Sequence, residues 1–457
     1  MDNREKFASR LGFVLVSAGC AIGIGNVWRF PYITGQYGGG AFVLIYLVFL
    51  VIMGLPIMTM EFAVGRASQK SCGASFRALE PAGSRWHWSG YVGFAGNYLL
   101  MMFYTTVSGW MMWYIVKMLR GEFVGATAET AGAAFTAMLA NPAGQVFWMA
   151  AAVALGFLVC ARGLQNGVER VTKVMMVALL MLMLALAVRS VTLPGAAEGL
   201  RFYLVPDFAR LRAAGIGTVV YAAMGQSFFT LSLGIGSMAI FGSYIGKERR
   251  LLSESVNIAV LDTFVALTAG FIIFPACFAY GVDPGQGPGL VFVTLPRIFG
   301  EMPGGRIWGA VFFVFLSFAA LSTVIAVFEN IVAFGMDLWH WSRRKSVLVN
   351  FFGVLVLSVP CALGFSVWSG FAPLGPGSTI LDLEDFIVSN NLLPLGSLVY
   401  VLFCTRRAGW GFPAFLTEAN TGRGLRFPKW VRFYVSTILP LIVLFIFVMG
   451  YKEKFFA

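Results

Sequence analysis

Oxygen-bearing side chains interrupt several long apolar segments of this 457-residue sequence. They are Asn26, Thr230, Ser232, Asp262 and the adjacent pair Ser322 and Thr323. Carboxylate, amide, hydroxyl and carbonyl oxygens are the ligands that hard cations such as sodium prefer. A carboxylate in an apolar segment is costly to bury unless it is paired or neutralised, which makes Asp262 a candidate functional group. These residues predict a site for a small cation.

Two glycine-dense stretches lie beside these residues, each halfway along an apolar run. Residues 19–26 read GCAIGIGN and residues 232–237 read SLGIGS. Each glycine lowers helix stability by about 1 kcal/mol relative to alanine. In a bilayer, unwound backbone is tolerated only where it lines a cavity or binds something, although close helix packing on glycine is the alternative interpretation. Two such breaks favour a binding site, since unwound carbonyls suit a cation and half-helix N-termini suit a carboxylate.

The elements that must position these residues are apolar runs of about 20 residues, each long enough to cross a bilayer as a helix. We expect an all-α, polytopic membrane protein with eleven spans. The spans are predicted near 11–35, 40–65, 88–119, 145–161, 168–190, 213–243, 252–280, 307–340, 347–370, 380–404 and 431–451. The composition agrees, because 58% hydrophobic and 12% charged residues leave too little charge for the surface of a soluble domain of this length.

One membrane domain, 1–457, is expected, since no stretch reads as a soluble domain or a long linker. The breaks fall in the first and sixth spans, five spans apart. This spacing predicts an inverted repeat of five helices, with 1–190 as the first copy, 213–404 as the second and 431–451 as an extra helix.

The net charge of +12 does not indicate nucleic-acid binding. Basic residues cluster in short segments between apolar runs, such as 66–85, 247–250, 343–345 and 406–432, whereas 121–144 contains none. This asymmetry predicts a multi-pass protein of the inner (plasma) membrane with a cytoplasmic N-terminus, and an odd number of spans then places the C-terminus outside. The six cysteines lack metal-ligand or CxxC spacing and are interpreted as packing residues.

The residues around both breaks resemble the neurotransmitter:sodium symporter family. The matching strings are RLGF at 10–13, GIGNVWRFP at 23–31, GGGAF at 38–42 and GQSFFTLSLG at 225–234. The resemblance extends over essentially the whole chain and is similar to a bacterial branch with eleven spans. It implies a non-enzymatic transporter that imports an amino acid with sodium by alternating access.

The resemblance also implies two sodium sites. The first uses the carbonyl of Ala21 with Asn26, Thr230, Asp262 and the substrate carboxylate. The second uses the carbonyls of Gly19, Ile22 and Ala319 with the hydroxyls of Ser322 and Thr323.

Substrate contacts and gates are implied in the same way. The substrate-binding residues are Ala21, Gly23, Ile24, Gly25, Leu100, Tyr104, Phe229 as a lid, Thr230, Ser232, Ile235, Val324 and Val327. The outer gate pairs Arg29 with Asp385, and the inner gate involves Arg4, Tyr244 and Asp337.

Two of these positions indicate what is carried. Gly23 stands where amine transporters of the family have an aspartate, so it leaves room for a substrate carboxylate and favours an amino acid. Asp262 stands where chloride-dependent relatives have a neutral asparagine, so its charge predicts independence from chloride. The apolar pocket residues favour a hydrophobic or aromatic L-amino acid, with leucine, tyrosine and tryptophan all open.

Other functions remain as alternatives at this point. A different small zwitterion, an amino-acid receptor or a channel on the same scaffold would fit the spans. An enzyme is not expected, because the chain has no HExxH motif and no Ser–His pair.

Several further residues carry individual expectations. Val177 replaces a proline usual in the family ten residues after Gly167, which predicts a changed release route through the fifth span. Glu61 is expected to hold the loosened backbone of the sixth span. Glu329 is interpreted as facing an aqueous vestibule, with a proton site as the alternative, and Glu384 as solvated at the mouth.

Overall fold

A computed structural model describes residues 5–284 and 289–455. Those residues form helices and no strand, with a single isolated parallel bridge between Arg249 and Arg423. The all-α prediction is therefore confirmed.

The chain folds into helices along nearly its whole length. The α-helices are α1 (Arg10–Ala21), α2 (Phe30–Gln36), α3 (Gly40–Phe49), α4 (Leu55–Ser68), α5 (Cys72–Leu79), α6 (His87–Arg120), α7 (Ala128–Leu139), α8 (Pro142–Ala161), α9 (Arg170–Val191), α10 (Ala196–Leu204), α11 (Phe208–Ala213), α12 (Ile216–Thr230), α13 (Ser237–Ser243), α14 (Leu251–Ala279), α15 (Leu295–Glu301), α16 (Gly305–Trp339), α17 (Arg343–Leu363), α18 (Ile380–Asp385), α19 (Leu393–Thr405), α20 (Phe412–Ala419) and α21 (Leu439–Phe455). The π-helical turns are η1 (Gly25–Arg29), η2 (Leu50–Gly54), η3 (Leu164–Glu169), η4 (Leu290–Thr294), η5 (Phe386–Leu392) and η7 (Tyr434–Ile438), and η6 (Lys429–Val431) is a 3₁₀ turn.

Nine helices within the described residues are long and apolar enough to cross a membrane, or ten when α1 and the η1–α2 segment count as one bent span. The predicted sixth span, 213–243, corresponds to α12 and α13, which are separated at 231–236. Each of these two helices is too short to be included among the nine that could cross a membrane. The multi-pass architecture is confirmed, and the number eleven stays a prediction.

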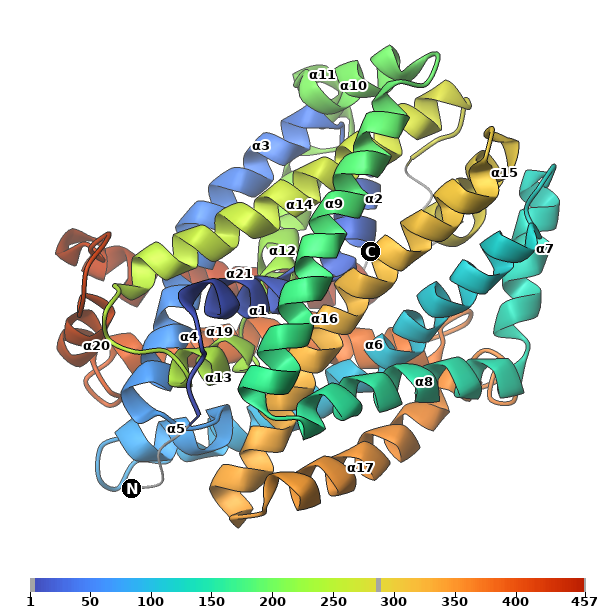
Figure 1. Ribbon diagram of the computed structural model, residues 1–457. Coiled ribbons are helices and arrows are strands. Elements are labelled where there is room, and N and C mark those ends of the chain that lie inside the picture. The colour runs from blue at the N-terminus through green and yellow to red at the C-terminus, as the bar shows by residue number, and fades with distance from the viewer. Residues whose placement is uncertain (1–4, 285–288, 456–457) are drawn as a thin grey trace.

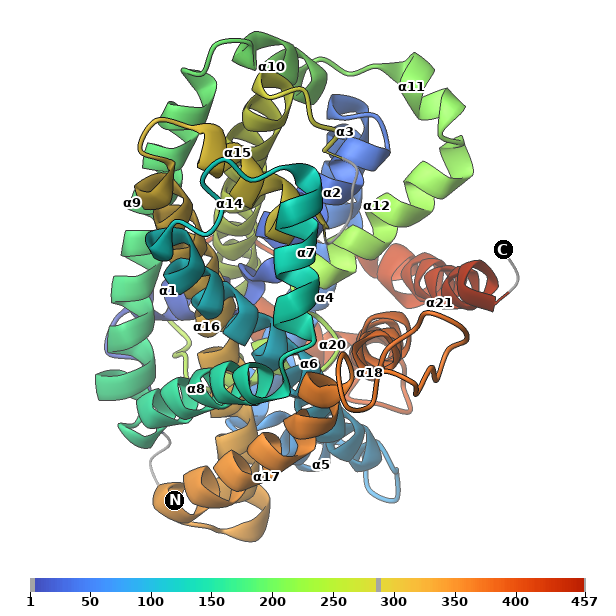
Figure 2. The same cartoon turned by 90° about the vertical axis from the view of Figure 1, so that its right-hand side faces the viewer.

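Short helices occupy the segments predicted to be loops. Segment 121–144 contains α7, segment 190–212 contains α10 and α11, and segment 281–306 contains α15. In both views α10, α11 and α15 gather at one end of the bundle, while α5 from segment 66–85 lies at the other (Figures 1 and 2). The segments that we expected on opposite sides of the membrane therefore lie at opposite ends of the molecule.

The broken helices occupy the centre of the bundle. α1 packs against α9, α14 and α16, and α13 packs against α4. α16 is the most enclosed span, with 78% of its apolar window buried, compared with 33% for the lipid-facing span that contains α9. A helix that is apolar on all sides is stable only when it is surrounded, so α16 forms the wall against which the breaks are placed.

Candidate functional site

The first break ends α1 at Ala21. Ile22 leaves the helix with φ −71° and ψ 94°, and the chain resumes as the π-helical turn η1, bent by 55° from α1. The carbonyl groups at the end of α1 therefore lack the N–H donors of a continuing helix. They can accept hydrogen bonds from other donors or bind a cation. The glycine-dense string at 19–26 predicted this interruption.

The second break separates α12 from α13. Ser232, Gly234 and Gly236 all have positive φ, at +50°, +99° and +78°. A side chain at Gly234 would also place its Cβ 2.2 Å from the carbonyl oxygen of Leu393. Glycine is required at this position because it alone tolerates both the left-handed backbone and the close approach.

Glu61 of α4 stabilises the unwound backbone of the second break. Its fully buried carboxylate accepts hydrogen bonds from the backbone N–H groups of Gly234 and of Met238, the latter at 3.3 Å. On another side, the amide of Asn97 donates to the carbonyl of Ile235 at 2.8 Å. These bonds satisfy backbone groups that have no helical partner, which confirms the structural role expected for Glu61.

Three of the four residues predicted for the first sodium site lie together. Asn26 Nδ2 donates to Asp262 Oδ1 at 2.8 Å, and Thr230 Oγ1 donates to Asp262 Oδ2 at 2.9 Å. All three side chains are fully buried. In the part of the chain that the structure describes, no basic side chain forms an ion pair with Asp262, so neutral donors alone face this carboxylate. Ala21, the fourth predicted residue, lines the central cavity.

The oxygens predicted for the second sodium site also converge. Thr323 Oγ1 lies 3.3 Å from the carbonyl oxygen of Gly19, 3.5 Å from that of Ile22 and 3.4 Å from that of Ala319. Ser322 Oγ lies 2.9 Å from the carbonyl of Ala319. One hydroxyl hydrogen can serve only one of these carbonyls at a time, which leaves electron-rich oxygens from α1 and α16 facing one point.

A central cavity of about 20 Å³ lies between the two breaks. Its lining consists of Ala21, Gly23, Gly25, Leu100, Tyr104, Phe229, Ser232, Thr323 and Leu393. The hydroxyl of Tyr104 accepts a hydrogen bond from the N–H of Ile24 at 3.1 Å, and a Cβ at Gly23 would lie 2.3 Å from that hydroxyl. The volume holds about one water molecule, so a larger molecule requires the lining side chains to move.

Five of the predicted substrate contacts are not among the residues that line this cavity: Ile24, Thr230, Ile235, Val324 and Val327. Val324 packs against Gly156 of α8, where a Cβ would approach the valine Cγ1 to 2.9 Å, and Val327 is fully buried in α16. Ile235 lines a different cavity on another side of the second break. The role of these residues in binding stays a prediction, because it requires a rearrangement of the pocket.

The proposed outer gate is not an ion pair in this conformation. The guanidinium of Arg29 lies 4.5 Å from the ring centroid of Phe229, a cation–π contact, and Asp385 accepts from Ser389 Oγ at 2.6 Å. The ion pairs between described residues do not include Arg29 with Asp385. Arg29 therefore covers the cavity through the aromatic ring that was predicted to act as its lid.

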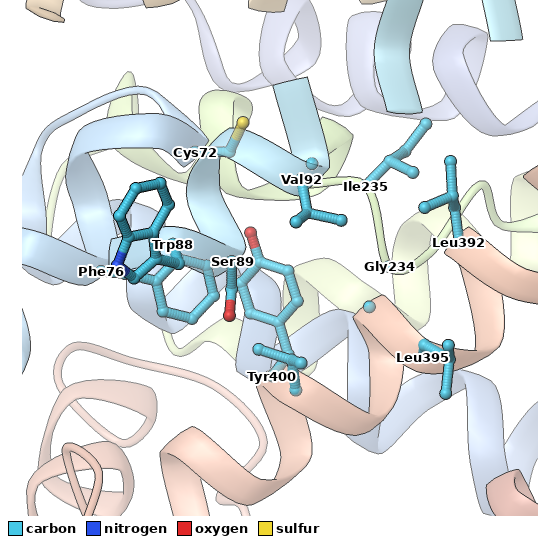
Figure 3. A pocket seen from close by; sticks show the side chains of 13 residues that line it. Cys72, Phe76, Trp88, Ser89, Val92, Gly234, Ile235, Leu392, Leu395 and Tyr400 are labelled. Atoms are coloured by element: carbon cyan, nitrogen blue, oxygen red, sulfur yellow. The ribbon is translucent and has the colours of Figure 1, made fainter. Parts of the chain in front are cut away.

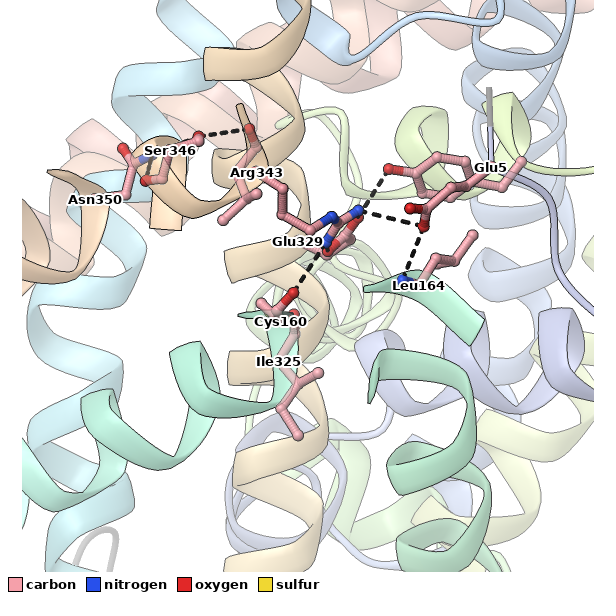
Figure 4. A network of polar contacts seen from close by, with 10 residues as sticks. Glu5, Cys160, Leu164, Ile325, Glu329, Arg343, Ser346 and Asn350 are labelled. Carbon is pink, nitrogen blue, oxygen red and sulfur yellow. Dashed lines mark hydrogen bonds and ion pairs between the residues drawn. The ribbon is translucent and has the colours of Figure 1, made fainter. Parts of the chain in front are cut away.

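At the opposite end, Tyr244 is bonded to Glu329, which belongs to a network of charged groups with Arg343 and Glu5 (Figure 4). The hydroxyl of Tyr244 donates to Glu329 at 2.9 Å, and the guanidinium of Arg343 binds the same carboxylate through two nitrogens, each at 2.9 Å. Arg343 also lies 3.5 Å from Glu5, which accepts from the N–H of Leu164 at 2.9 Å.

This network corrects the interpretation of Glu329. The side chain is fully buried and shared between Arg343 and Tyr244, so it does not face an aqueous vestibule. Glu384 is likewise buried, not solvated at the mouth. Of the other inner-gate residues, Asp337 accepts from the N–H of Ser71, and Arg4 lies outside the described residues.

Sequence reasoning missed two residues at this end, Glu169 and Arg343. The buried carboxylate of Glu169 accepts from the N–H of Ala8 at 2.7 Å and from Ser9 Oγ at 3.0 Å, and thereby ties the start of α1 to η3. A Cβ at Gly12 would lie 1.9 Å from this carboxylate, which explains the glycine. The sequence signal that could have identified Glu169 and Arg343 is that each is a charged residue at the edge of an apolar run.

The chain is similar to known transporters over nearly its full length. A model of the sodium:neurotransmitter symporter family matches residues 4–131 and 136–455. A Bacillus subtilis protein described as the uncharacterized sodium-dependent transporter YhdH is 36% identical, with 97% of this chain and 96% of that protein covered. An uncharacterized sodium-dependent transporter of Haemophilus influenzae is 31% identical, with 97% and 98% covered.

A solved structure supports the same relationship. The crystal structure of MhsT in complex with L-phenylalanine matches with a TM-score of 0.87 and 40% sequence identity, covering 98% of this chain and 100% of that one. The chain therefore shares its overall fold with that protein.

The role of Glu61 predicts a graded loss of stability. Glu61→Ala leaves buried N–H groups of the second break without partners, at a cost of about 1–3 kcal/mol each, whereas Glu61→Gln keeps one carbonyl acceptor and has a smaller effect. Thermal unfolding of the purified protein in detergent measures this order. Glu198→Ala, at an exposed acidic residue of α10, is the control. An Ala variant as stable as that control would contradict the role.

Proposed function

Because the chain belongs to the sodium:neurotransmitter symporter family, we propose that this sodium-dependent transporter imports a hydrophobic or aromatic L-amino acid by alternating access. Its transporter class and its multi-pass membrane fold follow from the family and from the helices. The substrate, the ion sites and the gates are the proposed part.

The observation that carries the proposal is the uncompensated charge of Asp262. A buried carboxylate faced only by Asn26 and Thr230 is unfavourable without a cation, because neutral hydrogen bonds do not balance a full charge in a low-dielectric interior. A sodium ion between Asp262, Asn26, Thr230 and the carbonyl of Ala21 would balance it. A second ion would bind among Thr323, Ser322 and the carbonyls of Gly19, Ile22 and Ala319.

The substrate carboxylate would bind beside the first ion. Gly23 has no side chain, and the space that a Cβ would occupy there lies 2.3 Å from the hydroxyl of Tyr104 and 2.8 Å from that of Thr323. A hydroxyl and the free backbone of the break suit an anionic group. The sodium ion and the carboxylate would then stabilise each other, which couples the two cargoes.

The rest of the cavity favours an apolar side chain on the substrate. Leu100, Phe229 and Leu393 contribute most of its apolar lining, and the polar groups lie beside the breaks. MhsT, which shares 40% of its sequence with this chain, was solved with L-phenylalanine. Both observations support a hydrophobic or aromatic amino acid over another small zwitterion.

The gates would open in turn around the bound cargo. On the outer side, movement of Arg29 and Phe229 would admit substrate and sodium, and their closure would occlude the site. On the inner side, separation of the Tyr244, Glu329 and Arg343 network from Glu5 would free the start of α1. The structure contains closed contacts at both ends, as an occluded state requires.

The membrane orientation is proposed on the same grounds. The N–H of Phe7 donates to the carbonyl of Tyr244 at the inner end, whereas Phe455 packs on Phe386 with ring centroids 5.4 Å apart at the α18–η5 junction. Phe386 follows Asp385, the predicted outer-gate residue, so this contact supports an end of α21 on the outer side and an odd number of crossings. We place the N-terminus in the cytoplasm and the C-terminus outside the inner membrane, with 1–190 and 213–404 as inverted repeats.

Sodium-dependent binding of a single amino-acid class is the direct test. Purified protein should bind one or more of leucine, phenylalanine, tyrosine and tryptophan in sodium and not in potassium, because the first ion completes the carboxylate site. Scintillation-proximity binding across the twenty amino acids measures this, and uptake into proteoliposomes separates a carrier from a receptor. No sodium dependence for any amino acid would overturn the proposal.

The second ion site predicts a shift in sodium affinity. Thr323→Val removes one oxygen from the converging set, and losing an interaction with a charged partner costs about 1.5–3 kcal/mol, or roughly tenfold or more in half-saturating sodium. Sodium titration of substrate binding measures the shift. Thr268→Val, whose hydroxyl bonds only within α14, is the matched control. Equal sodium dependence in the two variants would remove Thr323 from the site.

The charge of Asp262 predicts independence from chloride. Uptake should be unchanged when gluconate replaces chloride, because Asp262 supplies the negative charge itself. Asp262→Asn removes that charge and should make uptake weak and dependent on added chloride. Proteoliposome uptake in the two anions measures both effects, and a large loss of wild-type uptake in gluconate would refute the assignment.

A further inference from the structure

A second cavity beside the second break is separate from the proposed substrate pocket. It has a volume of about 210 Å³ and lies between α5, the start of α6, the break and α19 (Figure 3). Its lining is mainly apolar and includes Cys72, Phe76, Trp88, Val92, Leu395 and Tyr400. Of the predicted substrate contacts, Ile235 is the one that lines this cavity.

One side of the cavity opens toward the lipid. Trp88 and Val92 lie on the membrane span α6 and are 62% and 55% exposed. Large apolar side chains exposed on a span face hydrocarbon, and a tryptophan at the end of a span marks the interface with the headgroups. A lipid chain can therefore reach the cavity from the bilayer without passing through water.

A polar group inside the cavity has no partner. Tyr400 is only 2% exposed, and its hydroxyl forms no hydrogen bond to any described residue. In Figure 3 the side chain of Tyr400 lies among the other labelled lining residues. A buried hydroxyl without an acceptor is unfavourable, so it would donate to a carbonyl oxygen of a bound molecule.

Three arginines lie on two loops that meet each other near the cavity, the loop before α6 and the loop after α19. The indole Nε1 of Trp86 donates to the carbonyl of Ala408 at 2.7 Å, which joins the loop before α6 to the loop after α19. Arg85 is adjacent to Trp86, and Arg406 and Arg407 precede Ala408. All three are exposed, and among the described residues none of them forms an ion pair.

The loop before α6 is connected to the wall of the cavity through Phe403 of α19. Phe76, a lining residue, packs on Phe403 with centroids 4.9 Å apart, and Phe403 packs on Trp86 at 5.4 Å. The acidic residue in this region is Glu80. Burial disfavours its ionised form, but hydrogen bonds from His87 and Ser84 outweigh that effect and hold the pKa of its carboxyl below the usual range. Because Glu80 is already bonded to His87, it does not neutralise the arginines.

We propose that this cavity binds an anionic phospholipid from the leaflet beside Arg85, with an acyl chain between α5, α6 and α19, an ester carbonyl at Tyr400 and the phosphate at Arg85, Arg406 and Arg407. Basic pockets between spans are typical binding sites for anionic headgroups. The acyl chain of the lipid would pack against Gly234 and Ile235, which line the cavity and belong to the second break. The lipid would therefore support the unwound segment on a side that Glu61 does not reach.

The headgroup contacts are tested by lipid binding to the purified full-length protein. Native mass spectrometry, with titration by phosphatidylglycerol or phosphatidylcholine, measures the affinity for each. Wild type should prefer phosphatidylglycerol, since each basic residue near an anionic group contributes about fivefold. R85Q/R406Q/R407Q should lose about tenfold or more of that preference. The control R423Q/R426Q/K429Q removes the same charge from a different loop and should keep it.

The proposed contacts of the acyl chain are tested by filling the cavity with a larger side chain. Val92→Trp should weaken binding of both phospholipids, whereas Val188→Trp on the exposed face of α9 should not. Both positions are exposed to lipid, so neither change is expected to prevent folding. An equal loss of phosphatidylglycerol binding in the two triple variants would indicate general surface charge and overturn the site. Unchanged binding in Val92→Trp would overturn the acyl-chain position.

Discussion

A backbone that unwinds inside a bilayer must still satisfy its N–H and C=O groups, and the centre of this molecule is arranged around that constraint. Glu61 meets it at the second break, where its carboxylate binds the N–H groups of Gly234 and Met238. Asn97 meets it from α6 by binding the carbonyl of Ile235. At the first break no side chain fully satisfies the carbonyls at the end of α1, and these are the oxygens proposed to bind sodium.

The two breaks therefore have complementary chemistry. At the second break a protein carboxylate accepts hydrogen bonds from backbone N–H groups. At the first break carbonyl oxygens are exposed that a positive charge would stabilise. They are joined directly, since Ser232 Oγ donates to the carbonyl of Cys20 at 3.3 Å. Asp262 lies beside both and has no basic partner among the described residues. Binding of a cation would remove unfavourable charge from the interior and fix the relative position of α1 and α12 at the same time.

The two ends of the molecule are closed by different interactions. At the end proposed to face outward, the guanidinium of Arg29 lies over the ring of Phe229, a contact of modest strength that can separate without leaving a buried charge unpaired. At the end proposed to face the cytoplasm, the buried carboxylate of Glu329 is paired with Arg343, and breaking such a pair would leave a charge without compensation in a low-dielectric site. The proposed opening keeps this pair intact and separates Arg343 from Glu5, a longer contact at 3.5 Å.

Local chemistry in the sequence determined the broken helices and the apolar spans. Glycine lowers helix stability wherever it stands, so the strings at 19–26 and 232–237 indicate breaks without knowledge of any neighbour. The oxygen-bearing residues beside them could also be predicted, because the preference of oxygen ligands for hard cations is a property of the side chain itself. Tertiary structure alone decided which distant groups meet: Arg343 with Glu329, Glu169 with the start of α1, and Val324 against Gly156 and away from the cavity. Those contacts depend on how helices rotate and pack against one another, and composition along a single span does not specify that rotation.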